Sequence, residues 1–277
     1  PYTTPIGPTY DSGDFPRVFE RALAVADYAG FASRRAEAAR RGLLRGIGVA
    51  VFVESSGVAP SKLVGALGVR AGFFEAAEIR VDATGGVTVA LGTHNHGQGH
   101  ATTFAQVLAE RLGVPFERIR VIEGDTAAVP QGTGTFGSRS MVVGGSAIDR
   151  ACAKIVAKGR RIAAHLLEAD AADVTFERGR FRVAGTDRGV AFEAVARAAN
   201  LAHTLPAEIE PGLHETAFFD PTNFAYSNGA HVCEVEIDPE TGVVRIVRYV
   251  TVDDVGTVIN PMIVHAQVHG GLAQGLG

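Results

Sequence analysis

The stretch Glu78-Ile79-Arg80-Val81-Asp82, followed by Gly86-Val87, alternates polar and apolar residues and then turns at a glycine. The same pattern returns 156 residues later as Glu234-Val235-Glu236-Ile237-Asp238, followed by Gly242-Val243. Alternation with a period of two and a turn that ends in glycine predict a β-hairpin in each stretch. A loop and a glutamine-bearing helical segment follow each hairpin. Two interpretations stay open: convergence of unrelated hairpins, or a duplicated hairpin-loop-helix unit whose two helix starts face one ligand.

Around these hairpins, helical and strand patterns alternate irregularly, which predicts the α+β (mixed α/β) fold class. Residues 1–45 are predicted to form an N-terminal connector and two helices, and residues 46–277 a single binding domain. The first helix is capped by Asp14, and the paired arginines Arg34-Arg35 and Arg40-Arg41 are interpreted as a solvated face of the second. Further elements are expected at 118–123 (strand), 138–167 (long helix), 174–183 (hairpin) and 192–199 (helix).

The composition excludes several classes of protein. Hydrophobic residues make up 46% of the 277 residues and charged residues 20%, which is typical of a folded protein. The net charge of −4 argues against a nucleic-acid partner. No apolar run is long enough to predict a membrane span, and Pro1–Pro5 lacks the pattern of a signal peptide. Two cysteines, Cys152 and Cys233, are too few for a disulfide framework, so a cytoplasmic location is expected.

The loop Gly97-Gln98-Gly99-His100 lies between a predicted strand and a predicted helix. Free N–H groups at a helix start attract anions, and glycine lets a phosphate approach the backbone. The Gln98 amide both donates and accepts, which suits the edge of a neutral heterocycle. The alternative is a glycine-bearing turn that binds nothing. Three histidines, His94, His96 and His100, also leave a catalytic zinc formally open, although no cysteine completes a structural zinc site.

A second loop, Gly132-Thr133-Gly134-Thr135-Phe136-Gly137, matches the glycine fingerprint of dinucleotide-binding folds letter by letter. That motif must directly follow a strand and must be followed by an acidic residue about 20 positions on. Neither condition is met here, so a nicotinamide dehydrogenase is only a weak alternative. Ser138-Arg139-Ser140 still places two hydroxyls and a guanidinium at a second helix start, which suits a diphosphate. A serine-capped helix without a ligand is the alternative. The pair Gly144-Gly145, within the long predicted helix, indicates that another group approaches its backbone.

Several motifs follow one another in a set order along the chain. They are Gly97-Gln98-Gly99-His100-Ala101-Thr102-Thr103-Phe104-Ala105-Gln106, Gly124-Asp125-Thr126, Thr135-Phe136-Gly137-Ser138-Arg139-Ser140, Asp253-Asp254-Val255-Gly256, Asn260-Pro261 and Gly270-Gly271-Leu272-Ala273-Gln274-Gly275. Together they resemble the molybdenum-binding subunit of the xanthine dehydrogenase and aldehyde oxidase family. The opening Tyr10-Asp11-Ser12-Gly13-Asp14-Phe15 is most similar to the branch of aerobic carbon monoxide dehydrogenase large chains.

The resemblance implies molybdopterin cytosine dinucleotide, with its molybdenum, as the cofactor. The cofactor-binding residues that it implies are Gln98, Gly99, Thr135, Gly137, Ser138, Arg139, Ser140 and Gln274. The protein is expected to supply few or no ligands to the metal, and no residue of this chain is assigned as catalytic. The family's glutamate base, in a Gly-Glu pair, is expected to lie outside the chain, as are the substrate loops. The implied reaction is the oxidative hydroxylation of an aldehyde, a heterocycle or carbon monoxide.

The resemblance also implies partners. They are the remaining part of the molybdenum subunit, an iron–sulfur subunit that carries [2Fe-2S] clusters, and a subunit that carries FAD. The chain is therefore expected to be incomplete at both ends and not catalytically complete by itself. A non-catalytic assembly module of the same fold, without cofactor, is the alternative. Such a module is expected to have lost the Gln98 amide or the Ser138-Arg139-Ser140 cluster, and the sequence retains both.

Overall fold

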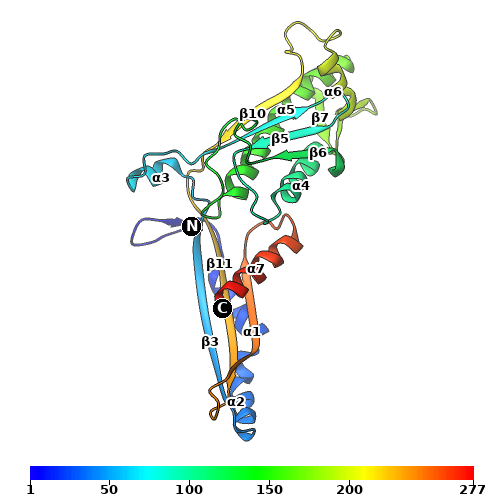
Figure 1. Cartoon of the computed structure of the whole chain (residues 1–277). Coiled ribbons are helices and arrows are strands. Elements are labelled where there is room, and N and C mark those ends of the chain that lie inside the picture. Colours follow the sequence, from blue (N-terminus) through cyan, green and yellow to red (C-terminus); the bar gives the residue numbers. More distant parts are fainter. The chain divides into compact units, whose positions relative to one another are not determined.

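The computed structural model describes all 277 residues, which divide into two compact units (Figure 1). The first unit comprises 1–56 and 225–257, and the second comprises 57–224 and 258–277. Helices and strands are mixed in both units, which confirms the predicted class. The division differs from the expected boundary at residue 45, because strand β3 (Leu44–Ser56) runs through that point and pairs with the distant strand β11 (Ala225–Ile237).

The second unit is built on a four-stranded sheet. Its strands are β10 (Leu213–Phe219), β4 (Glu75–Val81), β5 (Val87–Leu91) and β6 (Ile119–Ile122), in that spatial order. Helix α4 (His100–Leu112) connects the parallel strands β5 and β6, and helix α5 (Ser146–Leu166) packs against β4 and β10. Ile79, Phe104 and Ile148 are fully buried between the sheet and these helices. This packing fixes the end of β5 relative to the starts of α4 and α5.

Smaller elements complete the second unit. They are α3 (Ser61–Ala66), the sheet of β7 (Val174–Glu177), β8 (Arg180–Val183) and β9 (Gly189–Ala191), α6 (Phe192–Leu201) and α7 (Pro261–Leu276). Short 3₁₀ turns precede β6 at Phe116–Arg118 and β7 at Ala171–Asp173. The strand expected at 118–123, the hairpin at 174–183 and the helix at 192–199 are all confirmed. Strand β10 was not predicted, and it pairs antiparallel with β4 over its whole length.

Both repeated stretches form the predicted hairpins. β4 and β5 pair in the second unit, and β11 pairs with β12 (Val244–Asp254) in the first. In each turn an aspartate accepts a hydrogen bond from the main-chain N–H two residues later: Thr84 donates to Asp82 at 2.7 Å and Glu240 donates to Asp238 at 2.9 Å. Such turns recur with aspartate for local reasons. The two turns share this aspartate but differ in length by one residue: the Asp82 N–H donates to the Gly86 carbonyl, whereas the Asp238 N–H donates to the Val243 carbonyl. Whether the hairpins share an ancestor stays open.

The first unit is a three-stranded sheet in the order β12-β11-β3, with two helices packed against it. Helix α1 (Phe15–Val25) begins after Asp14, whose carboxylate accepts from the Arg17 N–H at 3.2 Å, as predicted. Helix α2 (Phe31–Arg40) follows a 3₁₀ turn at Tyr28–Gly30. Residues expected to be a plain connector form a short hairpin, β1 (Tyr2–Thr3) and β2 (Thr9–Tyr10). None of the chain's helices combines the length and the apolar content that a membrane span requires.

A network of arginines and glutamates ties the helices of the first unit to its sheet. Arg34 and Arg45 both bind the carboxylate of Glu234, which is 1% exposed. Arg41 and Arg45 bind Glu236. The interpretation as a solvated helix face is therefore wrong for Arg34, which is 20% exposed, whereas Arg35, Arg40 and Arg41 are exposed as expected, although Arg41 also pairs with Glu236. The acceptors of Arg34 and Arg41 come from β11, about 200 residues away, and no pattern local to the helix reveals them.

Glu234 should make the first unit sensitive to acid. Burial acts to raise the pKa of this carboxyl, but hydrogen bonds and charges from Arg34 and Arg45 outweigh burial and hold the pKa below its ordinary value of 4.5. The carboxylate therefore stabilises the fold above that value, and the stabilisation is lost as the pH falls through the lowered pKa. In urea unfolding, Glu234→Gln should differ from the unsubstituted chain more at about pH 6 than at about pH 3. Equal differences at the two pH values would contradict this account.

Candidate functional site

The first predicted loop connects the end of β5 to the start of α4. Gly97 and Gly99 adopt φ values of 102° and 81°, which favour glycine, and Gly99 is the N-cap residue of α4. No side chain caps this helix start. The Gln98 amide nitrogen donates to the His94 carbonyl at 3.3 Å, and its oxygen accepts from the His96 N–H. The loop is therefore a compact turn with an uncapped helix start at its end.

The second predicted loop leads from β6 to α5. The helix expected from residue 138 onward does not begin there: Ser138 has a φ of 49°, a six-residue π-helix follows at Ser140–Gly145, and α5 begins only at Ser146. Single π-helical turns occur frequently at functional sites. A Cβ on Gly144 would lie 3.3 Å from the Phe104 ring, so this glycine permits the close approach that the sequence indicates. No side chain caps the start of this π-helix either.

The two loops lie against each other. The His94 N–H donates to the Thr135 hydroxyl at 2.8 Å, and that hydroxyl shares a second hydrogen bond of 2.8 Å with Ser140. Deeper in the fold, the Gly134 N–H donates to the Gly92 carbonyl at 3.0 Å. A Cβ on Gly92 would collide with the backbone of Gly132, so the two chains touch where neither has a side chain. The structure thus places Thr135 and Ser140 against the first loop at His94, whose carbonyl also accepts from Gln98. The carbonyls of Gly137 and Ser138 accept from the main-chain N–H groups of Val58 and Gly57, and Gly99 lies against Ile263. That all of these residues contact one cofactor stays a prediction.

Gln274 does not join this group. It lies on α7, whose first turn is near the first loop: the Ile263 side chain packs on Gly99, and Asn260 donates to Gln106 at 3.0 Å. At 1.5 Å per residue, Gln274 is about 16 Å along the helix from Ile263. It is exposed, and α7 has no buried residue. The starts of α4 and α7, the helices that follow the two repeated hairpins, therefore lie close together, as the duplicated-unit interpretation expects. A contact between Gln274 and the cofactor stays a prediction.

Arg139 plays a different part from the one expected of its side chain. The guanidinium is fully buried, and so is its partner Glu75, at 3.2 Å. It also donates to the Gly134 carbonyl at 2.5 Å and to the Phe73 carbonyl. The expected contact of this guanidinium with a diphosphate is thus corrected, because its charge is enclosed within the protein. Sequence reasoning overlooked Glu75, which looks like one more polar residue of an alternating strand.

Glu75 holds three segments together at this point. Its second carboxylate oxygen accepts from the N–H groups of Ala76 and Gly92, at 3.0 and 3.2 Å. Burial raises the pKa of Glu75 and lowers the pKa of Arg139. A buried pair of this kind is costly to form and more costly to break, because one partner would be left as an uncompensated charge. The pair therefore fixes the second loop to the ends of β4 and β5.

The three histidines do not form a metal centre. His100 is buried, and its Nδ1 lies 2.9 Å from the Glu123 carboxylate, which also accepts from the Thr93 hydroxyl. His94 and His96 lie next to each other with ring centroids 4.5 Å apart. No three His, Cys, Asp or Glu side chains of the chain are grouped to hold a metal. His100 is thus a buried structural residue that links the start of α4 to the end of β6.

The nicotinamide alternative also lacks its structural context. Strand β6 ends at Ile122, and an irregular segment separates it from Gly132. The glycine fingerprint requires a strand that runs directly into the loop and a helix whose first turn faces the pyrophosphate. Here the loop is followed by the strained Ser138 and the π-helix. The match of letters at Gly132–Gly137 is therefore not a dinucleotide-binding βαβ unit.

Glu75→Gln tests the buried pair. The amide keeps the size of the side chain but leaves the Arg139 charge uncompensated, so we expect the free energy of unfolding to fall by about 3–5 kcal/mol. Glu177→Gln is the matched control, because Glu177 is 80% exposed in a surface pair and should contribute less than about 1 kcal/mol. Replacing both partners, as Glu75→Leu with Arg139→Met, should recover part of the loss. A Glu75→Gln change below about 1 kcal/mol in urea unfolding would contradict this role.

Known proteins resemble the chain over nearly its whole length. It is 46% identical over 281 residues to the carbon monoxide dehydrogenase large chain of Hydrogenophaga pseudoflava, covering 99% of this chain and 34% of that one. It is 39% identical to the nicotine 6-hydroxylase large subunit of Paenarthrobacter nicotinovorans, with 100% and 34% covered. The chain thus spans about a third of the length of these relatives.

Solved structures and a family model agree with these relatives. Carbon monoxide dehydrogenase from Oligotropha carboxidovorans matches with a TM-score of 0.90 at 41% identity, covering 98% of this chain and 34% of that one. Quinoline 2-oxidoreductase from Pseudomonas putida 86 matches with a TM-score of 0.91 at 37% identity, covering 99% and 35%. The family model of the molybdopterin cofactor-binding domain matches residues 21–277. The chain therefore belongs to the molybdopterin cofactor-binding domain family, within the molybdenum-binding subunits of the xanthine dehydrogenase family.

Proposed function

We propose that this chain binds molybdopterin cytosine dinucleotide between its two adjoining loops and forms part of the molybdenum subunit of an oxidoreductase. The observation that carries the proposal is the direct contact between the loops, through the hydrogen bond from the His94 N–H to the Thr135 hydroxyl. That contact places two uncapped helix starts beside each other in a member of a cofactor-binding family. Two such starts can share one diphosphate, because main-chain N–H groups at helix starts attract negative charge.

The residues fit such a group. A Cβ on Gly97 or on Gly134 would have no atom within 4 Å, so open space borders both loops. Glycine at these places lets a phosphate or a pterin ring approach the main chain. The flanking donors are neutral: amide, hydroxyl and main-chain N–H groups, which suit phosphate oxygens and the polar edges of pterin and cytosine. When bound, molybdenum supplies oxygen-atom transfer coupled to the two-electron oxidation of the substrate.

Each residue has a distinct part in the proposal. Beyond its bonds to His94 and His96, the Gln98 amide keeps one N–H and one oxygen lone pair for a ligand at the first helix start. Gly99 would let the cofactor approach the main chain there. Thr135 and Ser140, already hydrogen-bonded to each other, orient their hydroxyls at the second start. Gly137 and Ser138 form the strained turn between them. Arg139 acts as a positioning residue, because its guanidinium holds the loop from within through Glu75.

The reaction and the partners complete the proposal. The relatives are named for their action on carbon monoxide, nicotine and quinoline, which are a small gas and two nitrogen heterocycles. We propose oxidative hydroxylation of a substrate in this range, or of an aldehyde, by the assembled enzyme. The remaining part of the molybdenum subunit would supply the catalytic base and the substrate loops. Subunits with [2Fe-2S] clusters and FAD would accept the electrons, in the cytoplasm, where the free Cys152 and Cys233 stay reduced.

Gln98→Ala tests the cofactor site, with Gln267→Ala as the matched control, because Gln267 is an exposed glutamine on α7. The complex purified from its host is analysed for molybdenum and, after acid hydrolysis, for cytidine monophosphate. Loss of hydrogen bonds worth about 1.4 kcal/mol should lower the retained cofactor about tenfold in Gln98→Ala and leave it unchanged in the control. Unchanged molybdenum in Gln98→Ala would contradict the part assigned to Gln98, and the absence of molybdenum from the unsubstituted complex would favour the assembly module without cofactor. A different nucleotide at full occupancy would contradict the proposal outright.

A further inference from the structure

Strand β3 leaves an unprotected edge on the first unit. It is 13 residues long, and β11 is its one neighbouring strand in the sheet. Proteins usually protect such edges with charges, proline or short strands, since an open edge can pair with another chain. The stretch 46–53 of β3 contains no charged residue and no proline. Val51 is 65% exposed, and Val49 and Val53 are about two-fifths exposed. This edge therefore has the properties of a strand that pairs with a partner.

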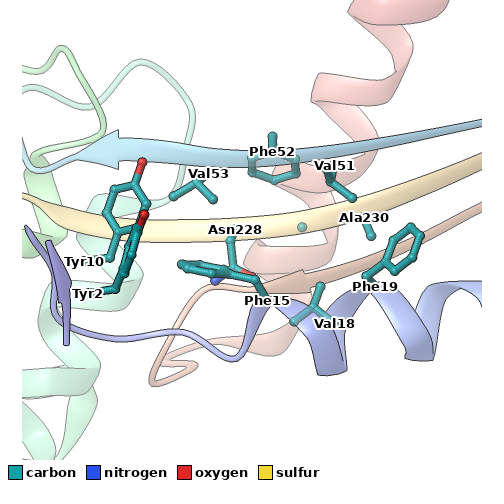
Figure 2. Close-up of a pocket in the computed structure, with 11 residues that line it drawn as sticks. Tyr2, Tyr10, Phe15, Val18, Phe19, Val51, Phe52, Val53, Asn228 and Ala230 are labelled. Carbon is teal, nitrogen blue, oxygen red and sulfur yellow. The ribbon is translucent and has the colours of Figure 1, made fainter. Parts of the chain in front are cut away.

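An apolar groove adjoins the same edge. Val49, Val51 and Val53 lie opposite Val232, Ala230 and Asn228 of β11, so they share the face on which α1 packs. Figure 2 shows Phe15, Val18 and Phe19 of α1 on that same side, with Tyr2 and Tyr10 at the end of the groove. The space between α1 and β3 measures about 500 Å³. It can receive a few apolar side chains of a segment that pairs with β3.

One polar group lies within this apolar groove. The Asn228 side chain is 2% exposed, and neither its amide nitrogen nor its amide oxygen has a hydrogen-bond partner. Figure 2 shows it between β11 and the ring of Phe15. Buried amides without partners are rare, because each unmet hydrogen bond costs free energy. An amide donates and accepts at once, which is the complement of a peptide group.

We infer that the groove between α1 and β3 binds an extended, apolar segment from the part of the molybdenum subunit that lies outside these 277 residues. The free strand edge requires a polypeptide rather than a small molecule, and the uncharged lining selects apolar side chains. The relatives carry about two-thirds of their length outside the matched region, in the same enzyme. This inference rests on the proposed function, since it takes the partner from the same enzyme. The segment adds a strand to β3 and inserts alternate side chains over Val51 into the groove, where one polar side chain reaches the Asn228 amide.

Cross-linking tests the surface directly. A photo-reactive phenylalanine analogue replaces Val51 in the assembled enzyme, and the cross-linked peptide is identified by mass spectrometry. We expect a segment that matches the relatives' chains outside the region shared with this one. Arg178, 92% exposed at a turn of the second unit, is the control position. A cross-link to residues 1–277 of a second copy would replace the inference with a homodimer, and a yield no higher than at Arg178 would overturn it.

Substitutions separate binding from folding. Val51→Glu should lower the amount of co-purified partner at least tenfold, whereas the similarly shaped Val51→Thr should retain it. Asn228→Leu should leave the unfolding midpoint of the chain unchanged or raised, because it removes an amide without partners, and should still weaken partner retention about tenfold. Retention unchanged in both Val51→Glu and Asn228→Leu would overturn the inference. Molybdenum analysis of the same samples tests the proposed function separately. Bound molybdenum without a cross-link at Val51 would support the proposed function and contradict the groove inference. A cross-link without bound molybdenum would support the groove inference alone.

Discussion

The buried ion pair between Glu75 and Arg139 is the interaction on which the candidate site depends. It joins the start of β4, the end of β5 and the loop before the π-helix at one point without solvent. In this position the guanidinium gives up any contact with a ligand and instead sets where the neighbouring main chain and hydroxyls lie. The groups that the two loops offer to a ligand are therefore neutral N–H and O–H donors, and the positive charge of Arg139 is buried beneath the second loop. A binding site made of many neutral donors needs rigid support, because a small displacement of the loop would weaken several hydrogen bonds to the ligand at once.

Much of the fold could be predicted because its signals are local. The hairpins at 78–87 and 234–243, the Asp14 cap and the two glycine-rich loops follow from alternation, capping and turn residues within a few positions. The rest depends on pairing between distant segments. β10 pairs with β4, β3 pairs with β11, and Arg34 finds Glu234, and none of these partners leaves a mark on the local pattern. The π-helix at Ser140–Gly145 was also missed, because the local pattern predicted one continuous α-helix from residue 138.

The site itself divides in the same way. Glycine, amide and hydroxyl chemistry pointed to the two loops, and the structure joins them through His94 and Thr135. The individual cofactor contacts come from the family resemblance and stay predictions. The part assigned to the Arg139 side chain was wrong, since a basic residue beside two serines resembles an anion site until its buried partner is known. His100 shows the same difference between motif and side chain. It belongs to a glycine-rich motif, but its ring contacts the buried Glu123 carboxylate. A motif thus identifies a place in the chain more reliably than it identifies the direction of each side chain.

Hydrogen–deuterium exchange of the purified complex tests most directly whether the two loops form one cofactor site. Main-chain amides at 97–101 and at 134–140 are followed in samples with and without bound molybdopterin cytosine dinucleotide. A shared ligand predicts slower exchange in both segments in the cofactor-bound sample, while the turn at 178–179 stays the same. Protection of one segment alone, or of neither, would contradict the account.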